Sequence, residues 1–180
     1  LRAVHSDFRQ NVTRLEAAIE REDAIVDASQ RLLRVAASRD VSSPEDSMTA
    51  LLGRVFNSGR FDPVMGAYEA VIGSGGLAQI QGDSLRLALA DFASLVEGAY
   101  TELYSDQLYF DFIRSYTGKL GFAGAVLAMD AGPGKRTDTP PDNDAQLLSE
   151  LKFREHLALR VLGERDVAGY YRVLLAKAQR

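Results

Sequence analysis

The chain has 180 residues, with 21 Lys and Arg against 25 Asp and Glu, which gives a formal net charge of −4. This length fits one domain, and the acidic balance argues against a general nucleic-acid-binding protein, which usually has a basic face. Apolar residues at 46% and charged residues at 26% are ordinary globular values, and they exclude disordered, collagen-like and multi-span membrane proteins.

The sequence contains no Cys and only two His. Disulfides, thiolate catalysis and Cys-based metal centres are therefore excluded, and the absence of thiols slightly favours an extracytoplasmic compartment. No window has the run of about 18 apolar residues that a membrane span needs. The chain begins at Leu1 rather than Met, which indicates a soluble domain cut from a longer protein.

The first predicted helix runs from Leu1 to about Arg39, a stretch without Pro or Gly. Its apolar stripe has the four-three spacing that is typical of coiled coils and up-down bundles. Glu22 and Ser29 fill the two stripe positions that lack an apolar residue. The apolar members of the stripe are Phe8, Val12, Leu15, Ile19, Val26 and Leu33.

Two short helices are predicted next, over about 43–57 and 63–72. Each opens with a capping residue followed by Pro, which is favoured at the first helical position. The second helix leads into Gly73-Ser74-Gly75-Gly76. This turn needs backbone conformations that are closed to most other residues.

The fourth predicted helix is as long as the first, and extends from its cap Asp83 to about Thr117. Its seam has heptad spacing and consists of Leu85, Leu89, Phe92, Val96, Ala99, Leu103, Phe110 and Ile113. Further aromatic residues widen the apolar face: Tyr100, Tyr104, Tyr109, Phe112 and Tyr116. Because the aromatic run covers more than one face, we expect part of it to be exposed as a surface for a partner.

The segment 118–145 is the least regular, and its Pro residues predict a mobile loop over 130–144. The last helix is predicted from about Asp144 to Gln179. Its seam consists of Leu147, Leu151, Leu157, Val161, Ala168, Tyr171 and Leu175. The sequence therefore predicts an all-α fold, an antiparallel bundle of three long and two short helices that forms one domain over 1–180.

No residues in this pattern point to catalysis or to a cofactor. His5 and His156 lack a third ligand at metal-binding spacing, so we interpret them as surface histidines. Arg154 falls on the stripe of the last helix with Glu150 one turn before it, which predicts a structural ion pair. The alternative is an arginine that lines an anionic pocket. A candidate ligand pocket would be lined by Tyr68, Arg86, Tyr100, Tyr104 and Arg154.

One stretch is more specific than the rest: YEAVIGSGGLAQI over 68–80, followed by DSLR over 83–86. It resembles the central motif of an uncharacterised bacterial family, a domain of unknown function in single-pass membrane proteins. Tyr68, Glu69, Gly75 and Arg86 are the motif positions singled out here. The likeness extends to the first helix and to Leu151–Arg160, but it omits 118–145, and the family usually has Asn where Gly76 stands.

The resemblance implies a membrane helix before residue 1 and a domain that faces the periplasm; a cytoplasmic domain is the alternative. The family assigns no catalytic residues, so none are transferred. We expect a non-enzymatic, membrane-tethered interaction, scaffold or sensor module that binds a protein partner or itself and no nucleic acid. The alternative function is a helical sensor domain that binds a small molecule.

Overall fold

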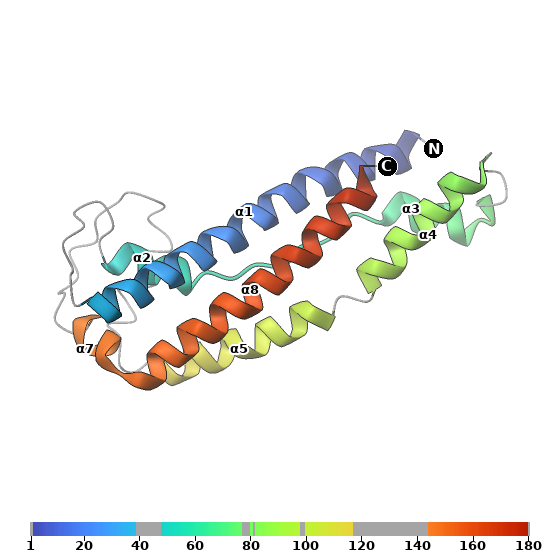
Figure 1. The fold of residues 1–180 in the computed structure, drawn as a ribbon. Coiled ribbons are helices and arrows are strands. Elements are labelled where there is room, and N and C mark those ends of the chain that lie inside the picture. Colours follow the sequence, from blue (N-terminus) through green and yellow to red (C-terminus); the bar gives the residue numbers. More distant parts are fainter. Residues whose placement is uncertain are drawn as a thin grey trace. The chain divides into compact units, whose positions relative to one another are not determined.

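The computed structural model describes residues 2–38, 48–76, 80, 82–97, 100–116 and 144–179; within these helices, the side chains of 48, 49, 100–106, 113 and 144–146 are not described. The helices in this part of the chain are labelled in Figure 1. They are α1 (Arg2–Ser38), α2 (Met48–Val55), α3 (Gly66–Gly73), α4 (Asp83–Glu97), α5 (Tyr100–Tyr116), α7 (Asp144–Ser149) and α8 (Leu151–Ala178). The described residues form helices and no strand, so the predicted all-α class is confirmed.

Contacts divide the chain into two compact units. Unit 1 comprises Leu1–Glu20, Arg60–Tyr100 and Ala168–Arg180, and unit 2 comprises Arg21–Gly59 and Thr101–Val167. Helices α1 and α8 contribute residues to both units. Each unit has its own apolar cluster, and the prediction of a single domain stays a prediction.

The core of unit 2 is built around the ring of Phe112 on α5. Phe112 stacks on Phe56 at 4.7 Å between ring centroids and on Phe153 at 5.6 Å. Tyr109, three residues before Phe112, donates a 2.9 Å hydrogen bond to the carbonyl oxygen of Phe56. Aliphatic side chains from α1, α2, α7 and α8 complete this core: Ala28, Leu32, Leu51, Leu52, Val55, Leu147, Leu148 and Leu157.

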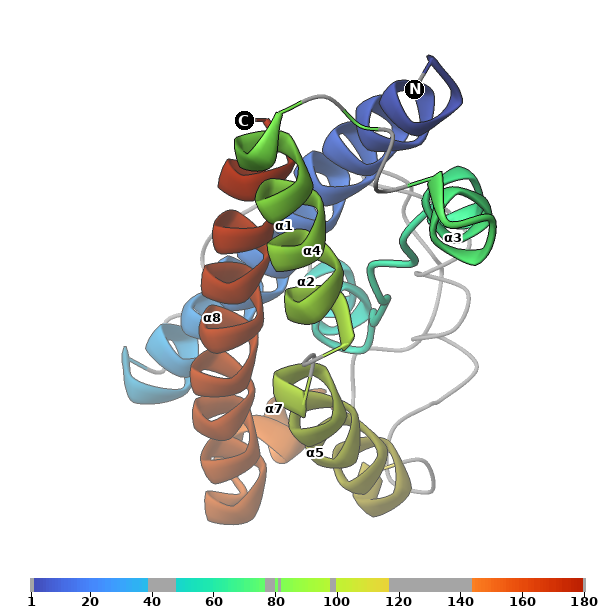
Figure 2. The same cartoon turned by 90° about the vertical axis from the view of Figure 1, so that its right-hand side faces the viewer.

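The core of unit 1 brings α3 and α4 against the first turns of α1. Phe8 on α1 contacts the buried Phe92 of α4 at 4.8 Å between ring centroids. On its other side α4 meets the end of α8, where Tyr170 donates a hydrogen bond to the carbonyl oxygen of Leu95 (Figure 2). The buried members of this cluster are Val4, Tyr68, Ile80 and Leu89.

The predicted extent of the first helix is confirmed by α1, and so is the place of Glu22 and Ser29 on its buried stripe. The apolar part of the stripe is confirmed at Leu15, which is fully buried, but it was wrong at four other positions. Val12, Ile19, Val26 and Leu33 are half-buried, and the fully buried residues that the stripe omitted are Ala18, Ile25, Ala28 and Leu32. The predicted stripe omitted Ala18 and Ala28, although small residues allow neighbouring helices to approach closely.

The third helix begins at Gly66, three residues later than predicted, because residues 61–65 form an extended strap before it (Figure 1). The side-chain amide of Asn11 accepts a hydrogen bond from the backbone N–H of Val64 (2.7 Å) and donates one to its carbonyl oxygen (2.9 Å). Asp7 Oδ2 accepts from the N–H of Ala67 at 2.8 Å, so α1 supplies the cap of α3. The Asp62-Pro63 start signal was therefore wrong.

The second helix ends at Val55, close to its predicted end, and its predicted start at Ser43 lies outside the described residues. The single helix predicted from Asp83 to about Thr117 is two helices, α4 and α5. Residues 98 and 99 between them lie outside the described residues. The predicted loop over 130–144 lies almost entirely outside the described residues.

Three predicted seam residues are exposed, namely Leu85 on α4, Phe110 on α5 and Leu151 on α8. On α5 the buried face is instead formed by Phe112 and Tyr116. On α8 the buried face includes Phe153 and Val167, which the seam omitted. The other seam residues were largely placed correctly, since Leu89 and Phe92 on α4 and Leu157, Val161, Ala168 and Tyr171 on α8 are buried. The heptad template erred at single positions because apolar residues occur on more than one face of these helices.

Candidate functional site

The residues proposed for a ligand pocket are divided between the two units. Unit 1 holds Tyr68, which is buried in its core, together with Arg86 and Tyr100; unit 2 holds Tyr104 and Arg154. The side chains of Tyr100 and Tyr104 lie outside the described residues. A pocket that includes all five residues therefore stays a prediction.

The motif positions around α3 and α4 have structural roles in unit 1. Arg86 Nη1 donates a 3.0 Å hydrogen bond to the carbonyl oxygen of Ile80, and Arg86 Nη2 pairs with Asp83. Gly75 has a positive φ of 71°, which confirms the special turn expected after α3, and Glu69 is exposed. The motif thus braces the connection from α3 to α4.

Arg154 is half-buried on α8, and its Nε is buried without a hydrogen-bond partner in the described part of unit 2. Its pairing with Glu150 stays a prediction. The arginine that α8 does bury completely is Arg160, six residues further along the helix. Arg160 was not among the residues predicted from the sequence to form a site.

Arg160 belongs to a buried ionisable cluster of unit 2 that we call the carboxyl pair site, formed by Glu22, Arg160 and Glu164. The three residues are 1%, 2% and 3% exposed. Arg160 Nη1 donates to Glu164 Oε1 one turn further along α8. Its other terminal nitrogen, Nη2, donates a 2.6 Å hydrogen bond to the carbonyl oxygen of Asn57. The guanidinium also lies over the ring of Tyr109, with Cζ 4.8 Å from the centroid.

The two carboxyl groups of this site are hydrogen-bonded to each other, so one of them must carry the shared proton. Burial is the largest cause that raises the pKa of Glu22, to about 9, and the hydrogen bond to Glu164 and the charge of Glu164 add to it. The positive charges of Arg21 and Arg160 act in the opposite direction and are outweighed. Glu22 is therefore the protonated member at neutral pH, and Glu164 is the carboxylate that Arg160 binds.

Arg21, the neighbour of Glu22 on α1, lies beside the carboxyl pair site. Its Nε lies 3.5 Å from Glu22 Oε1, and Gly59 packs directly on its guanidinium, since a Cβ at position 59 would lie 2.6 Å from Arg21 Cζ. Arg21 Nε and Nη2, Glu22 Oε1 and Arg160 Nε are buried atoms without a hydrogen-bond partner in the described residues. Chemically, the site retains one proton and one ion pair inside unit 2.

His156 is half-buried and is not the surface residue that we expected. Its Nδ1 lies 3.0 Å from the hydroxyl oxygen of Tyr116 on α5. Burial, and then the charge of Lys152, lower the pKa of His156, against the opposing effect of Asp111 and Glu155. The neutral imidazole thus pairs with Tyr116 and helps to fix α8 on α5. His5 is exposed, as predicted.

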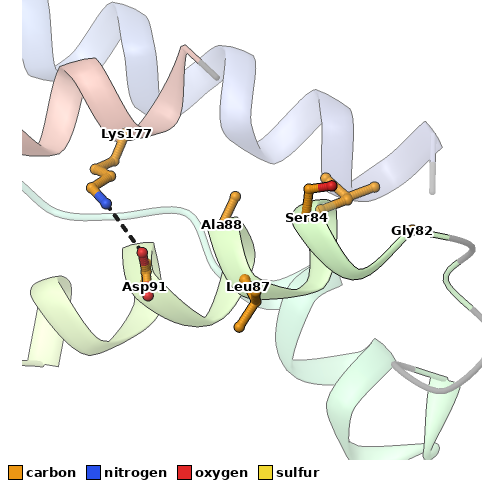
Figure 3. Close-up of a pocket in the computed structure, with 7 residues that line it drawn as sticks. Gly82, Ser84, Leu87, Ala88, Asp91 and Lys177 are labelled. Carbon is orange, nitrogen blue, oxygen red and sulfur yellow. Dashed lines mark hydrogen bonds and ion pairs between the residues drawn. The ribbon is translucent and has the colours of Figure 1, made fainter.

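Unit 1 has an open depression of about 660 Å³ beside α4 (Figure 3). Lys177 Nζ from α8 reaches Asp91 Oδ2 at its edge, 3.1 Å away. The two charges in its lining therefore satisfy each other. The remaining lining residues are Gly82, Ser84, Leu85, Leu87 and Ala88.

The outer face of α8 in unit 2 carries apolar side chains that no described residue covers. Leu151 is 65% exposed, Leu162 is 58% exposed and Leu159 is 39% exposed, and the exposed Ala158 lies between them. We call these four residues the α8 strip. Single exposed leucines are common on protein surfaces, but a row of them on one helix face is typical of an interaction surface.

The sequence contained a signal for the carboxyl pair site. Leu157, Glu164 and Tyr171 follow one another at seven-residue spacing, so Glu164 occupies a stripe position of α8, as Glu22 does on α1. Two charged residues at stripe positions of two helices indicate a buried polar pair. The signal was missed because the seam of α8 was drawn from apolar residues only.

Comparison with protein-family models, with curated proteins and with solved structures finds no match to this chain. The family resemblance therefore rests on the residues quoted for it. None of the helices in the described ranges has both the length and the apolar character that a membrane span requires. Within those same ranges, no group of three or more His, Asp or Glu side chains is arranged to hold a metal ion.

Proposed function

We propose that this chain is a non-enzymatic helical interaction module that binds a protein through the α8 strip. The supporting observation is the exposure of Leu151, Leu159 and Leu162 on one face of a helix whose opposite face is fully packed. A binding module needs a rigid scaffold behind its contact residues. Phe153, Leu157 and Arg160 on the buried face of α8 provide that support.

Photocrosslinking in cells tests this function. A photoreactive amino acid replaces Leu162 in the full-length gene product, and a matched variant carries it at Glu16, an exposed position of α1. We expect a discrete crosslinked species at position 162 that is absent at position 16. Equal or absent crosslinking at both positions would contradict an interaction through the α8 strip.

The resemblance of residues 68–86 to the membrane-tethered family supports a proposed location as well. We propose a membrane anchor that precedes residue 1 and a domain in the periplasm. Protease treatment of intact spheroplasts tests the location, with lysed cells as the control. Cleavage in intact spheroplasts, with the protein in the membrane fraction, is expected; a protected soluble protein would contradict it.

The depression beside α4 favours a second candidate function, a sensor for a small molecule. Apolar Leu85 and Leu87 with the charged pair Asp91 and Lys177 would suit a small amphipathic ligand. Thermal unfolding against a panel of metabolites separates the two functions, because a ligand that binds only the folded state raises the Tm. A ligand-dependent rise that Leu87→Asp abolishes would favour the sensor.

A further inference from the structure

We propose that the partner of the α8 strip is a second copy of this chain, bound antiparallel with its own α8 against the first. This inference rests on the proposed function and names its partner. The argument comes from the order of apolar and charged residues along the exposed face of α8 in unit 2. Apart from the strip, this face carries Lys152, Glu155, Arg165 and Asp166, all exposed.

The apolar residues determine the register. Ala158 and Leu162 are one turn apart on the exposed face, so an antiparallel pair buries both when Ala158 of each copy lies opposite Leu162 of the other. This register is centred on position 160. Leu159 then lies beside Leu159 of the second copy, close to the two-fold axis. A small residue opposite a large one is the packing that neighbouring helices favour.

The same register pairs every charged residue of the face with an opposite charge. The midpoint between Glu155 and Arg165 in the sequence is also position 160. Glu155 therefore lies opposite Arg165 of the second copy, and the reverse pair forms by symmetry. The midpoint between Lys152 and Asp166 is position 159, one residue away. Lys152 of one copy therefore lies near Asp166 of the other, along the edge of the contact. Two pairs of opposite sign, whose midpoints differ by a single residue, give the face charge complementarity with itself.

A parallel arrangement of the two α8 helices would not bring these opposite charges together. In a parallel pair, each residue lies level with its own copy, so Glu155 faces Glu155 and Arg165 faces Arg165. These like charges would lie at both ends of the apolar contact and would oppose association. The order Glu155, Ala158, Leu162, Arg165 therefore selects the antiparallel pair.

Light scattering on the full chain over a range of concentrations gives the first test. We expect a dimer, and a monomer for Leu162→Glu. Glu155→Arg and Arg165→Glu should each weaken self-association at least ten-fold, because each places like charges in both symmetric pairs. An equimolar mixture of these two variants should regain wild-type affinity, since the mixed dimer has complementary charges in both pairs. A merely structural defect would not be rescued by mixing.

Engineered cysteines test the direction, because the chain has none of its own. Under oxidation, Leu159→Cys should form a disulfide with its own copy. Leu151→Cys should not, since its two copies would be about 27 Å apart at 1.5 Å per residue. Disulfides from both variants would indicate a parallel pair and overturn the proposal.

The two proposals fail separately. A chain that stays monomeric at high concentration but forms a discrete crosslink from position 162 to another protein overturns self-association and leaves the interaction function intact. A monomer without any specific crosslink at position 162 overturns both. Dimerisation that neither Leu162→Glu nor the charge variants alter overturns the α8 strip as the interface.

Discussion

The carboxyl group of Glu22 on α1 is hydrogen-bonded to the carboxyl group of Glu164 on α8, inside unit 2. Two carboxyl groups that share a hydrogen bond in a buried site cannot both be ionised, so the pair holds one proton. Arg160 neutralises the remaining charge through its bond to Glu164. Hydrophobic packing alone would tolerate sliding between α1 and α8, whereas these directional bonds favour one register of the two helices.

The shared proton predicts that stability depends on pH. The pKa of Glu22 is raised from 4.5 to about 9 in the folded state. Between these values the folded chain holds a proton that the unfolded chain has released, so the free energy of unfolding falls as the pH rises. The contribution is fully present below 4.5 and is lost by about pH 9.

Urea unfolding at pH 7 and pH 9 measures this effect. His156, whose pKa is lowered from 6.5, and Tyr68 and Tyr116, whose pKa values are raised from 10.0, change charge outside this window. We expect a loss of up to about 1.4 kcal/mol per pH unit in the wild type and a much flatter profile for Glu22→Gln. Glu20→Gln, on the exposed side of α1, should keep the wild-type slope; equal slopes in all three proteins would contradict the shared proton.

Arg160→Met tests the ion pair. The substitution removes the partner of a buried carboxylate and the donor to the Asn57 carbonyl oxygen, so unfolding should become easier by about 3–5 kcal/mol. Adding Glu164→Leu removes the stranded charge and should recover part of this loss. Arg114→Met, on the exposed side of α5, should change stability by less than about 0.5 kcal/mol. No recovery in the double variant would show that Arg160 acts through packing alone.

The sequence predicted the helices well where a regular period governs them. The seven-residue spacing along α1 was sufficient to find its length and to place Glu22 and Ser29 on its buried stripe. It was insufficient for α8, where Leu151 and Leu162 continue an apolar pattern on the outside of the helix. Periodicity shows that a face is apolar, but it does not show whether another element covers that face.

Contacts between distant residues account for the other differences. The Asp62-Pro63 signal is a normal helix start, yet Asn11 binds both backbone groups of Val64 and holds this stretch extended. The partner lies 53 positions away in sequence, so no local pattern contained it. Arg160 was overlooked partly for the same reason, because two of its partners, the carbonyl oxygen of Asn57 and the ring of Tyr109, are distant in sequence.

Asn11→Leu tests the strap of unit 1. The variant loses the amide that both donates to and accepts from Val64, and we expect it to be about 2 kcal/mol less stable, since two hydrogen bonds are lost and the backbone groups they satisfied are left unpaired. Hydrogen exchange at the backbone amide of Val64 should become faster. Gln10→Leu at the neighbouring exposed position is the control and should leave that amide protected. An unchanged exchange rate in Asn11→Leu would show that the strap is held by its apolar contacts instead.

Gly75→Ala tests the turn after α3. Gly75 has φ of 71°, so an alanine there adopts a left-handed conformation, which costs about 1–2 kcal/mol although its side chain meets no neighbouring atom within 4 Å. Gly73 is the matched control, because it ends α3, has the same open surroundings and needs no positive φ. Gly73→Ala should be neutral or slightly stabilising, since alanine favours the helix. Thermal unfolding of both variants measures the difference, and equal stability of the two would mean that the turn relaxes to a conformation with negative φ at position 75.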